Sequence, residues 1–220
     1  MTAADIDSER FEALWRRCIA SPPAASPTEV RDRLRGLLGS PNRHFHNLDH
    51  IRDCLRRADE VASLLADRDA VEMALWFHDA VYEPGDSSNE RRSAELFLSL
   101  SVGARPAFRR RVCELILTTR HCAPPRSCDR RFIDDIDLAG FGAPWDEFMR
   151  QGALLRKEFS MQTDAEYHRG QLYFLRMLAQ RPTFFASDYF RDRYETAARD
   201  NLRRLLALLG DAGVPAPGAA

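Results

Sequence analysis

Two stretches of the sequence carry histidines that can bind a metal ion. His44, His46 and His50 lie in the stretch RHFHNLDHI, and His78 precedes Asp79 at the end of the apolar run ALWFHDA. Neutral imidazoles and carboxylates are good ligands for first-row divalent cations. A carboxylate at the end of a buried helix must be paired or bound to a cation, because an isolated buried charge is costly. A His-Asp pair at an exposed helix end explains the second stretch equally well.

The spacing of His46 and His50 depends on where a helix begins. Residues four apart share a helix face, but Asn47 is a good N-cap, which places His46 just outside the helix and His50 in its first turn. His44 precedes them in an extended lead-in and need not point the same way. For any one of these histidines, a solvated position near a helix start remains the simpler interpretation.

The segment FIDDIDLAGFG, residues 132–142, supplies further acidic candidates. Asp135 and Asp137 cannot both face the core if Ile136 lies on the same helical stripe, so we expect one of them to point inward as a ligand. An Asp-rich loop is the alternative, since such loops are common. His121 ends a predicted helix and can either reach a site or interact with the helix C-terminus, where an imidazolium is favoured. We expect His121 to reach the metal site and His168 to be structural or exposed.

The elements that must position these residues are predicted to be helical nearly throughout. Apolar residues recur at three- and four-residue spacings from Phe11 to Ile19, and a Pro-rich break follows. We expect Thr28 to cap a second helix that ends at Gly39, and Ser88 or Asn89 to cap a later one. The remaining helical patterns cover residues 48–65, 71–78 and about 106–121, 145–160, 165–180 and 188–209. The sequence therefore predicts an all-α fold with one domain over residues 1–210 and a disordered tail at 211–220.

Composition limits the classes of protein that remain. The formal net charge of −1 gives no strong field for nucleic acid, so no nucleic-acid partner is expected. The five cysteines form no Cys-x-x-Cys pair, which favours reduced thiols and a cytoplasmic location. No apolar run approaches the roughly 20 residues that span a bilayer, so no membrane partner is expected either.

The order His50, His78-Asp79, Asp137 resembles the HD superfamily of metal-dependent phosphohydrolases. FHNLDHI is also similar to the His-Asn-x-x-His motif of cyclic-nucleotide phosphodiesterases, and HDAVYEPGDSSNE is similar to their His-Asp, Pro-Gly and Asn pattern. The resemblance is closest to a bacterial family of predicted HD phosphohydrolases, and it rests on the segments RHFHNLDH, NERRSA and DIDLAGFG. The segments RKEF and ARDNL are also similar, so the likeness covers most of the chain. It implies a compact helical HD-domain (phosphodiesterase-like) fold.

Three departures from related patterns limit what can be transferred. Phe45 replaces the usual tyrosine of the first motif. Tyr82 stands where alarmone hydrolases and bacterial 5′-nucleotidases of the superfamily carry a glutamate, with Glu83 one position later, so their substrates are not expected here. The Gly-Tyr-Pro signature of a cyclic-di-GMP subfamily is absent after the His-Asp pair.

The resemblance implies a role for each candidate residue. His50, His78, Asp79 and Asp137 are expected to bind one divalent cation (Mn²⁺, Mg²⁺, Fe²⁺, Co²⁺, Ni²⁺ or Zn²⁺). His46 is expected to protonate the leaving oxygen, and Arg43 to bind the phosphate as a clamp. Asp79 is expected to contribute to catalysis by bridging to a second, more weakly held ion. His121, Asn89 and Glu90 are expected to make outer-sphere contacts or to bind a second metal. For Asn89 and Glu90, a helix cap and a first-turn acid explain the sequence at least as well.

The expected activity is hydrolysis of a phosphoester of a nucleotide or another small phosphorylated molecule, by metal-activated water. Two alternatives stay open. One is an HD-fold di-iron oxygenase, for which His121 is the residue of interest, and the other is a catalytically silent metal-binding or interaction module. A homodimer is also compatible with the sequence.

Overall fold

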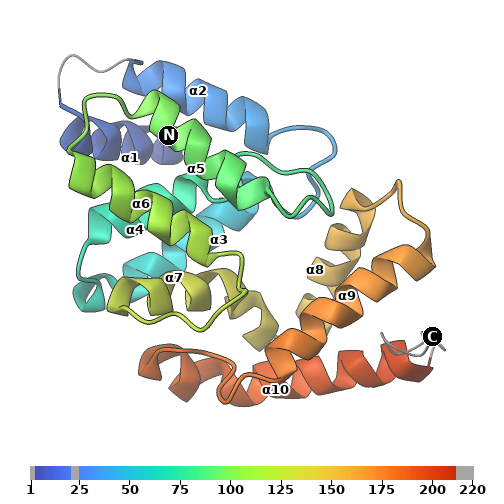
Figure 1. The fold of residues 1–220 in the computed structure, drawn as a ribbon. Helices are drawn as coiled ribbons and strands as arrows, with labels where there is room; N and C mark the ends of the chain where they lie inside the picture. The colour runs from blue at the N-terminus through green and yellow to red at the C-terminus, as the bar shows by residue number, and fades with distance from the viewer. Residues whose placement is uncertain (1–2, 21–24, 212–220) are drawn as a thin grey trace.

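The computed structural model describes residues 3–20 and 25–211, and these residues form an all-α fold, as predicted. Figure 1 shows the helices, which are α1 (Ala3–Cys18), α2 (Pro27–Leu38), α3 (Leu48–Glu60), α4 (Arg68–Phe77), α5 (Asn89–Leu100), α6 (Pro106–Thr118), α7 (Cys128–Leu138), α8 (Trp145–Glu158), α9 (Asp164–Ala179) and α10 (Asp188–Asp211). Short 3₁₀ turns, η1 (Ala62–Leu64) and η2 (Ala139–Gly142), follow α3 and α7. Within the described ranges the only extended pairing is an isolated bridge between Ile19 and Ala104. Nearly all of the predicted tail, residues 212–220, lies outside them.

Helix α4 lies at the centre of the larger group of helices. Every residue from Ala70 to Phe77 is buried, and α4 contacts α1, α3, α5, α6 and α7. In Figure 1 helices α1–α7 gather around it, α8 and α9 follow one another outside this group, and α10 runs along one side of the molecule, in contact with α9. No helix among the described residues is both long and apolar enough to cross a membrane.

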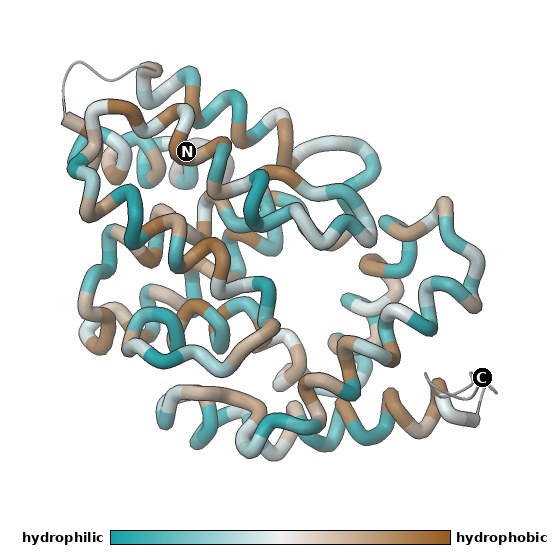
Figure 2. Tube along the Cα trace, viewed as in Figure 1, coloured by the Kyte–Doolittle hydropathy of each residue, from teal (hydrophilic) through white to brown (hydrophobic). Residues whose placement is uncertain are grey.

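The apolar faces predicted from helical spacing are the faces that pack. Along the helices in Figure 2, apolar segments alternate with polar ones, which is the pattern of amphipathic helices around a core. An aromatic cluster links α1 to α4: the ring centroids of Phe11 and Trp76 lie 5.4 Å apart, and those of Trp15 and Phe77 lie 6.2 Å apart. Aromatic pairs at this separation contribute roughly 0.5–1.5 kcal/mol beyond the area that they bury.

Helix ends follow the sequence signals with two corrections. Asn47 caps α3 as predicted, with its side-chain oxygen accepting from the amides of Asp49 and His50. The cap of α2 is Ser26 and not Thr28, because Ser26 and Glu29 form a reciprocal capping box that leaves Thr28 in the first turn. The helix after Asn47 ends at Glu60, before the predicted Leu65, and a 3₁₀ turn carries the chain onward.

The turn between α8 and α9 packs against the loop that follows Asp79. Gly85 in that loop has a φ of +86°, which L side chains rarely adopt. A Cβ atom on Gly85 would lie 3.1 Å from the side-chain nitrogen of Gln162 in the α8–α9 turn. The close approach places the end of α8 beside the histidine-rich segment.

Candidate metal centre

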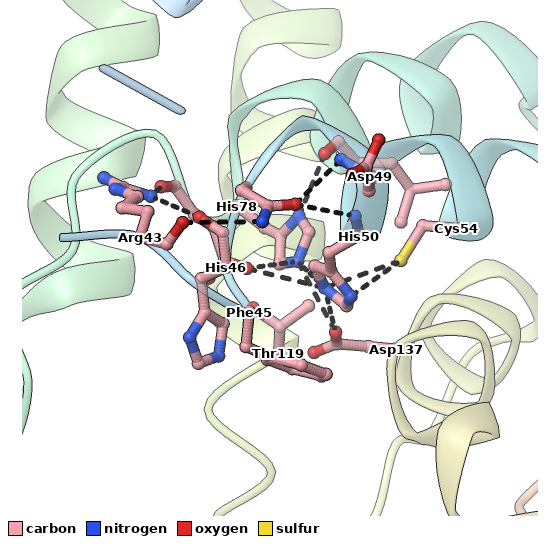
Figure 3. Close-up of polar contacts among 12 residues, drawn as sticks. Arg43, Phe45, His46, Asp49, His50, Cys54, His78, Thr119 and Asp137 are labelled. Carbon is pink, nitrogen blue, oxygen red and sulfur yellow. Dashed lines mark hydrogen bonds and ion pairs between the residues drawn. The ribbon is translucent and has the colours of Figure 1, made fainter. Parts of the chain in front are cut away.

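Three distant parts of the chain bring four predicted ligands together. His50 lies in the first turn of α3, His78 and Asp79 directly follow α4, and Asp137 lies near the end of α7. In Figure 3 the side chains of His50, His78 and Asp137 point toward one another. Helix packing therefore positions the group, because α3 contacts both α4 and α7.

The donor atoms of this group lie within a narrow range of separations. His50 Nε2 lies 3.3 Å from His78 Nε2, 3.2 Å from Asp137 Oδ1 and 3.5 Å from Asp79 Oδ2. His78 Nε2 lies 3.0 Å from Asp79 Oδ2 and 3.4 Å from Asp137 Oδ1. Ligands that each lie about 2.0–2.2 Å from one cation are separated by roughly 2.9–3.6 Å at ordinary coordination angles. The observed separations fit a shared cation.

Two further features fit a cation at this position. Asp79 Oδ2 is buried and makes no hydrogen bond in the part of the chain that the structure describes, although it faces both Nε2 atoms. His78 Nδ1 lies 2.9 Å from the carbonyl oxygen of Leu75, to which it can donate, so its Nε2 atom is left free as a metal ligand. A buried carboxylate oxygen without a hydrogen bond is costly unless a positive charge offsets its own, either that of a bound cation or that of a protonated His78 at 3.0 Å.

The charges of the group favour a cation as well. Burial alone would raise the pKa values of Asp79 and Asp137, but without a bound ion the positive charge of a protonated His78 lowers both well below their ordinary range. Burial would likewise lower the pKa of His78, but the two carboxylates raise it well above its ordinary value. The carboxylates therefore remain ionised and attract positive charge, which a divalent cation can supply.

Cys54 joins the group, and the sequence analysis did not identify it. Its Sγ atom lies 3.7 Å from His50 Nε2, and one donor atom each from His50, Cys54, His78 and Asp137 lie within 4.8 Å of one another. Burial raises the pKa of the thiol. The signal in the sequence was the spacing of four between His50 and Cys54, which places both on one face of α3.

His46 lies beside the ligand group rather than in it. Its ring centroid is 5.9 Å from that of His50, and its Nδ1 atom lies 2.7 Å from Oε2 of Glu158 at the end of α8. The other carboxylate oxygen of Glu158 accepts from the amides of Phe45 and His46 at 2.7 and 2.9 Å. Burial would raise the pKa of Glu158, but these hydrogen bonds lower it, so the buried side chain is a carboxylate.

Glu158 and Tyr82 are two residues of the site that the sequence analysis missed as contributors. The ring of Tyr82 lies against the ring of His46, with centroids 4.1 Å apart. Burial, followed by the charge of Glu158, raises the pKa of Tyr82, so its hydroxyl stays protonated. Glu158 lies in the RKEF stretch that belongs to the resemblance, but nothing in that stretch assigned it a role, since it is 112 residues from His46 and belongs to an amphipathic helix.

Arg43 has a different environment from the one expected of a phosphate clamp. Its two terminal nitrogens donate to the backbone carbonyls of His46, Asp79 and Ala80, with the first at 3.1 Å and the last at 3.0 Å. These bonds join the histidine-rich segment to the turn after α4. The geometry supports a positioning role for Arg43, because the nitrogens that would grip a phosphate are already engaged.

His121 contacts the ligand group through Asp137. Its Nε2 atom lies 3.0 Å from Asp137 Oδ2, and its Nδ1 atom lies 2.8 Å from Asp134 Oδ1. Arg181 donates to Asp134 at 2.7 Å and to the His121 carbonyl at 3.2 Å. His121 has a φ of +56°, an uncommon conformation for a residue other than glycine, and these contacts hold it there.

The acidic run of α7 corrects one expectation. Asp135, Ile136 and Asp137 all lie on the inner side, because α7 is enclosed on several faces, and Asp135 is completely buried. Asp135 accepts from the amides of Ala186 and Ser187, each at 2.7 Å, so it holds the segment before α10 and does not point at the metal ligands. Only Asp137 of the run contacts His50 and His78.

The remaining candidates have these positions. Asn89 exchanges two hydrogen bonds of 2.9 Å with the backbone of Glu83 and so closes the loop before α5. Glu90 is half-buried, and burial together with the charge of Asp79 raises its pKa. His44 is exposed and His168 is half-buried, in agreement with the interpretation of both as residues outside the site.

A large surface hollow lies elsewhere and was not predicted. It has a volume of about 790 Å³ and is lined by residues of α1, α3 and α4, including Arg10, Arg17 and Arg68. Each of these arginines forms an ion pair with a carboxylate, at 2.7, 2.7 and 3.0 Å respectively. Each arginine that lines the hollow among the described residues is therefore already paired with a carboxylate.

Comparison of the chain with models of known protein families, with curated proteins and with solved structures found no match.

Proposed function

We propose that this protein binds a divalent cation through His50, His78, Asp79 and Asp137 and hydrolyses a phosphoester of a small molecule. The observation that carries the proposal is the convergence of two imidazole nitrogens and two carboxylate oxygens, with His–His and His–Asp separations of 3.0–3.5 Å. The Asp79 oxygen of this group is buried and has no hydrogen-bond partner among the described residues. The motif order that resembles HD phosphohydrolases supports the same assignment independently.

When bound, the cation would lower the pKa of a water molecule and offset charge on a phosphoryl group. The two imidazoles and two carboxylates hold it, and Arg43 keeps the His46 and Asp79 backbones together through its carbonyl contacts. Two carboxylates and two neutral imidazoles leave a divalent cation without excess positive charge. Binding of the phosphate then depends on open coordination positions and on groups outside this set.

His46 is the proposed proton donor to the leaving oxygen. Glu158 contacts Nδ1 of His46 and also accepts from the amides of Phe45 and His46, so the ring has a fixed orientation and its Nε2 atom is not engaged by these contacts. The ring lies outside the ligand group, which agrees with a proton donor and not with a fifth ligand.

The contacts of His121 bear on the di-iron alternative. Both ring nitrogens are engaged by carboxylates, Nδ1 by Asp134 and Nε2 by Asp137. A histidine that ligates a second iron needs a free ring nitrogen, so His121 would have to leave one of these partners. A mononuclear hydrolytic site therefore agrees better with the geometry than a di-iron site does.

The test is to measure bound metal and turnover on the same preparations. Protein purified after growth with Mn²⁺, Fe²⁺, Co²⁺, Ni²⁺ or Zn²⁺ is analysed for metal by mass spectrometry and assayed against a panel of nucleotides and small phosphoesters, with Mg²⁺ added in parallel. We expect close to one ion per chain and metal-dependent release of phosphate or alcohol. Asp79→Ala should lose both properties, whereas the control variant Asp49→Ala, at an exposed position in the first turn of α3, should keep both.

Three results would contradict the proposal, each in a different way. If no preparation contains bound metal, the proposed metal site does not exist. One bound ion with no turnover on any phosphoester would favour the silent metal-binding module. Two bound irons with oxygen consumption would favour the oxygenase.

A further inference from the structure

We propose that Cys54 is a sulfur ligand of the same cation, and that the centre therefore takes a thiophilic transition metal such as Zn²⁺, Co²⁺ or Fe²⁺ in preference to Mg²⁺. This inference rests on the proposed metal site and reduces the range of cations expected to bind there. It assigns a role to a residue outside the pattern that carries the resemblance.

The position of the sulfur fits a ligand. Cys54 lies one helical turn after His50 on α3, and its Sγ atom is 3.7 Å from the Nε2 atom that also faces His78 and Asp137. A sulfur ligand about 2.3 Å from a metal lies roughly 3.3–3.8 Å from a nitrogen ligand of the same ion. Figure 3 shows the thiol directed at His50 from the side of the ring away from Arg43.

The surroundings of Cys54 distinguish it from the other cysteines. The side chain is only 2% exposed and is enclosed with the ligand group. The other four sulfur atoms lie near a carboxylate or a backbone carbonyl, as seen at Cys18, Cys113, Cys122 and Cys128. Cys54 is thus the one cysteine whose sulfur faces an imidazole of the site.

The chemistry of the donor set then restricts the metal. Mg²⁺ strongly prefers six oxygen ligands in octahedral geometry, and a set of two imidazoles, one sulfur and two carboxylates offers it oxygen from only two side chains. Zn²⁺, Co²⁺ and Fe²⁺ accept nitrogen, oxygen and sulfur together. On binding, the thiol loses its proton to solvent and the sulfur donates an electron pair to the cation, so no oxidant or reductant takes part.

The absorption spectrum of the Co²⁺-loaded protein tests the sulfur ligand directly. A cysteine thiolate bound to Co²⁺ gives an intense near-ultraviolet charge-transfer band, which nitrogen and oxygen ligands do not give. The full chain is used with the exposed Cys122 and Cys128 replaced by serine, so that surface thiols do not contribute. We expect the band at one Co²⁺ per chain, its loss in Cys54→Ser, and its retention in the matched variant Cys113→Ser, whose sulfur lies against Ala94.

Competition between metals tests the second half of the inference. We expect Zn²⁺ to displace Co²⁺ at equimolar concentration, and Mg²⁺ in large excess to leave the band unchanged. Cys54→Ser should weaken Zn²⁺ binding at least about tenfold, since losing even an outer-sphere contact of a metal site weakens it by roughly 10–100-fold.

The outcomes separate this inference from the proposed function. Bound Co²⁺ without a charge-transfer band in the protein that retains Cys54 and Cys113 would overturn the sulfur ligand and leave the four-residue site in place. Displacement of Co²⁺ by Mg²⁺ would overturn the metal preference. If no Co²⁺ binds at all, both the proposed site and the inference are wrong.

Discussion

The pair formed by His46 and Glu158 can be tested by the chemistry of the leaving group. If His46 donates a proton, His46→Ala should keep its metal but lose roughly 10²–10⁴-fold in turnover of an alkyl phosphoester. The loss should be much smaller for a nitrophenyl ester, because nitrophenolate leaves as a stable anion and needs little protonation. Parallel measurement of metal content and turnover on both esters checks this.

Glu158→Gln provides the companion variant. It keeps the size of the side chain and removes the charge that Nδ1 of His46 contacts at 2.7 Å, so we expect a loss in the same direction and with the same dependence on the leaving group. Equal losses on both esters, or metal stripped from His46→Ala, would rule out proton donation by His46.

The buried charge of His121 predicts how stability changes with pH in the metal-free protein. Burial lowers its pKa, but the hydrogen bonds to Asp134 and Asp137 outweigh this and raise it from 6.5 to about 9. The stability contributed by the protonated ring is therefore fully present below about pH 6.5 and is lost as pH rises through about 9. The shift corresponds to up to about 3 kcal/mol.

Denaturant unfolding of metal-free protein at several pH values measures this contribution. His78 also has a raised pKa, so the wild-type curve contains both residues, and the difference between wild type and His121→Asn isolates one of them. We expect the variant to be less stable near neutral pH and to lose less stability as pH rises toward 9. The same slope in both proteins would show that His121 is neutral in the folded state.

The cap of α3 connects helix formation to the metal site. Asn47 accepts two amide hydrogen bonds at the start of α3, and its own amide donates to the His44 carbonyl at 3.1 Å. Asn47→Ala should cost about 0.5–2 kcal/mol of stability, the usual range for a lost N-cap. It should also weaken metal binding, because the cap fixes the first turn that carries His50.

The cap of α2 supplies the matched control for this prediction. Ser26→Ala removes a cap of the same kind, with its capping box to Glu29, at a helix that carries none of the proposed ligands. We expect a stability loss of similar size and unchanged metal affinity, measured by unfolding and by metal titration. If Asn47→Ala also keeps its metal affinity, the cap of α3 does not influence metal binding.

The whole molecule should respond to metal removal because the ligands come from three separate parts of the fold. A cation bound only by the folded state stabilises it by about 2.7 kcal/mol at a free concentration of 100 Kd. For a chain of this size that corresponds to a fall in Tm on the order of 5–10 °C on chelation. Calorimetry with and without chelator, at confirmed metal content, measures the difference.

A Tm that stays constant after confirmed metal loss would mean that the ligand group is fully formed without the ion. Asp79→Ala serves as the internal control for this experiment. Since it lacks one proposed ligand, its Tm should not change on addition of chelator.

Local signals in the sequence predicted most of the helices and part of the site, but α7 (Cys128–Leu138) was not among the predicted helical patterns. Apolar spacing and capping residues predicted the later helices to within a few residues and the start of α3 at Asn47, because helix periodicity and N-cap chemistry act over a few neighbouring residues. The resemblance to HD phosphohydrolases implied His50, His78, Asp79 and Asp137 as the expected ligands, whereas local chemistry alone left exposed positions open for the histidines and did not choose between Asp135 and Asp137.

Only the tertiary structure decided which distant groups share the site. Glu158 lies 112 residues from His46, and the choice of Asp137 over Asp135 as the contact of His50 depends on how α7 is enclosed by its neighbours. The resemblance implied that Arg43 binds phosphate, but in the folded chain its guanidinium donates to three backbone carbonyls. These pairings depend on how the helices pack, and packing is set by contacts between remote parts of the chain that leave no periodic signal in any one segment.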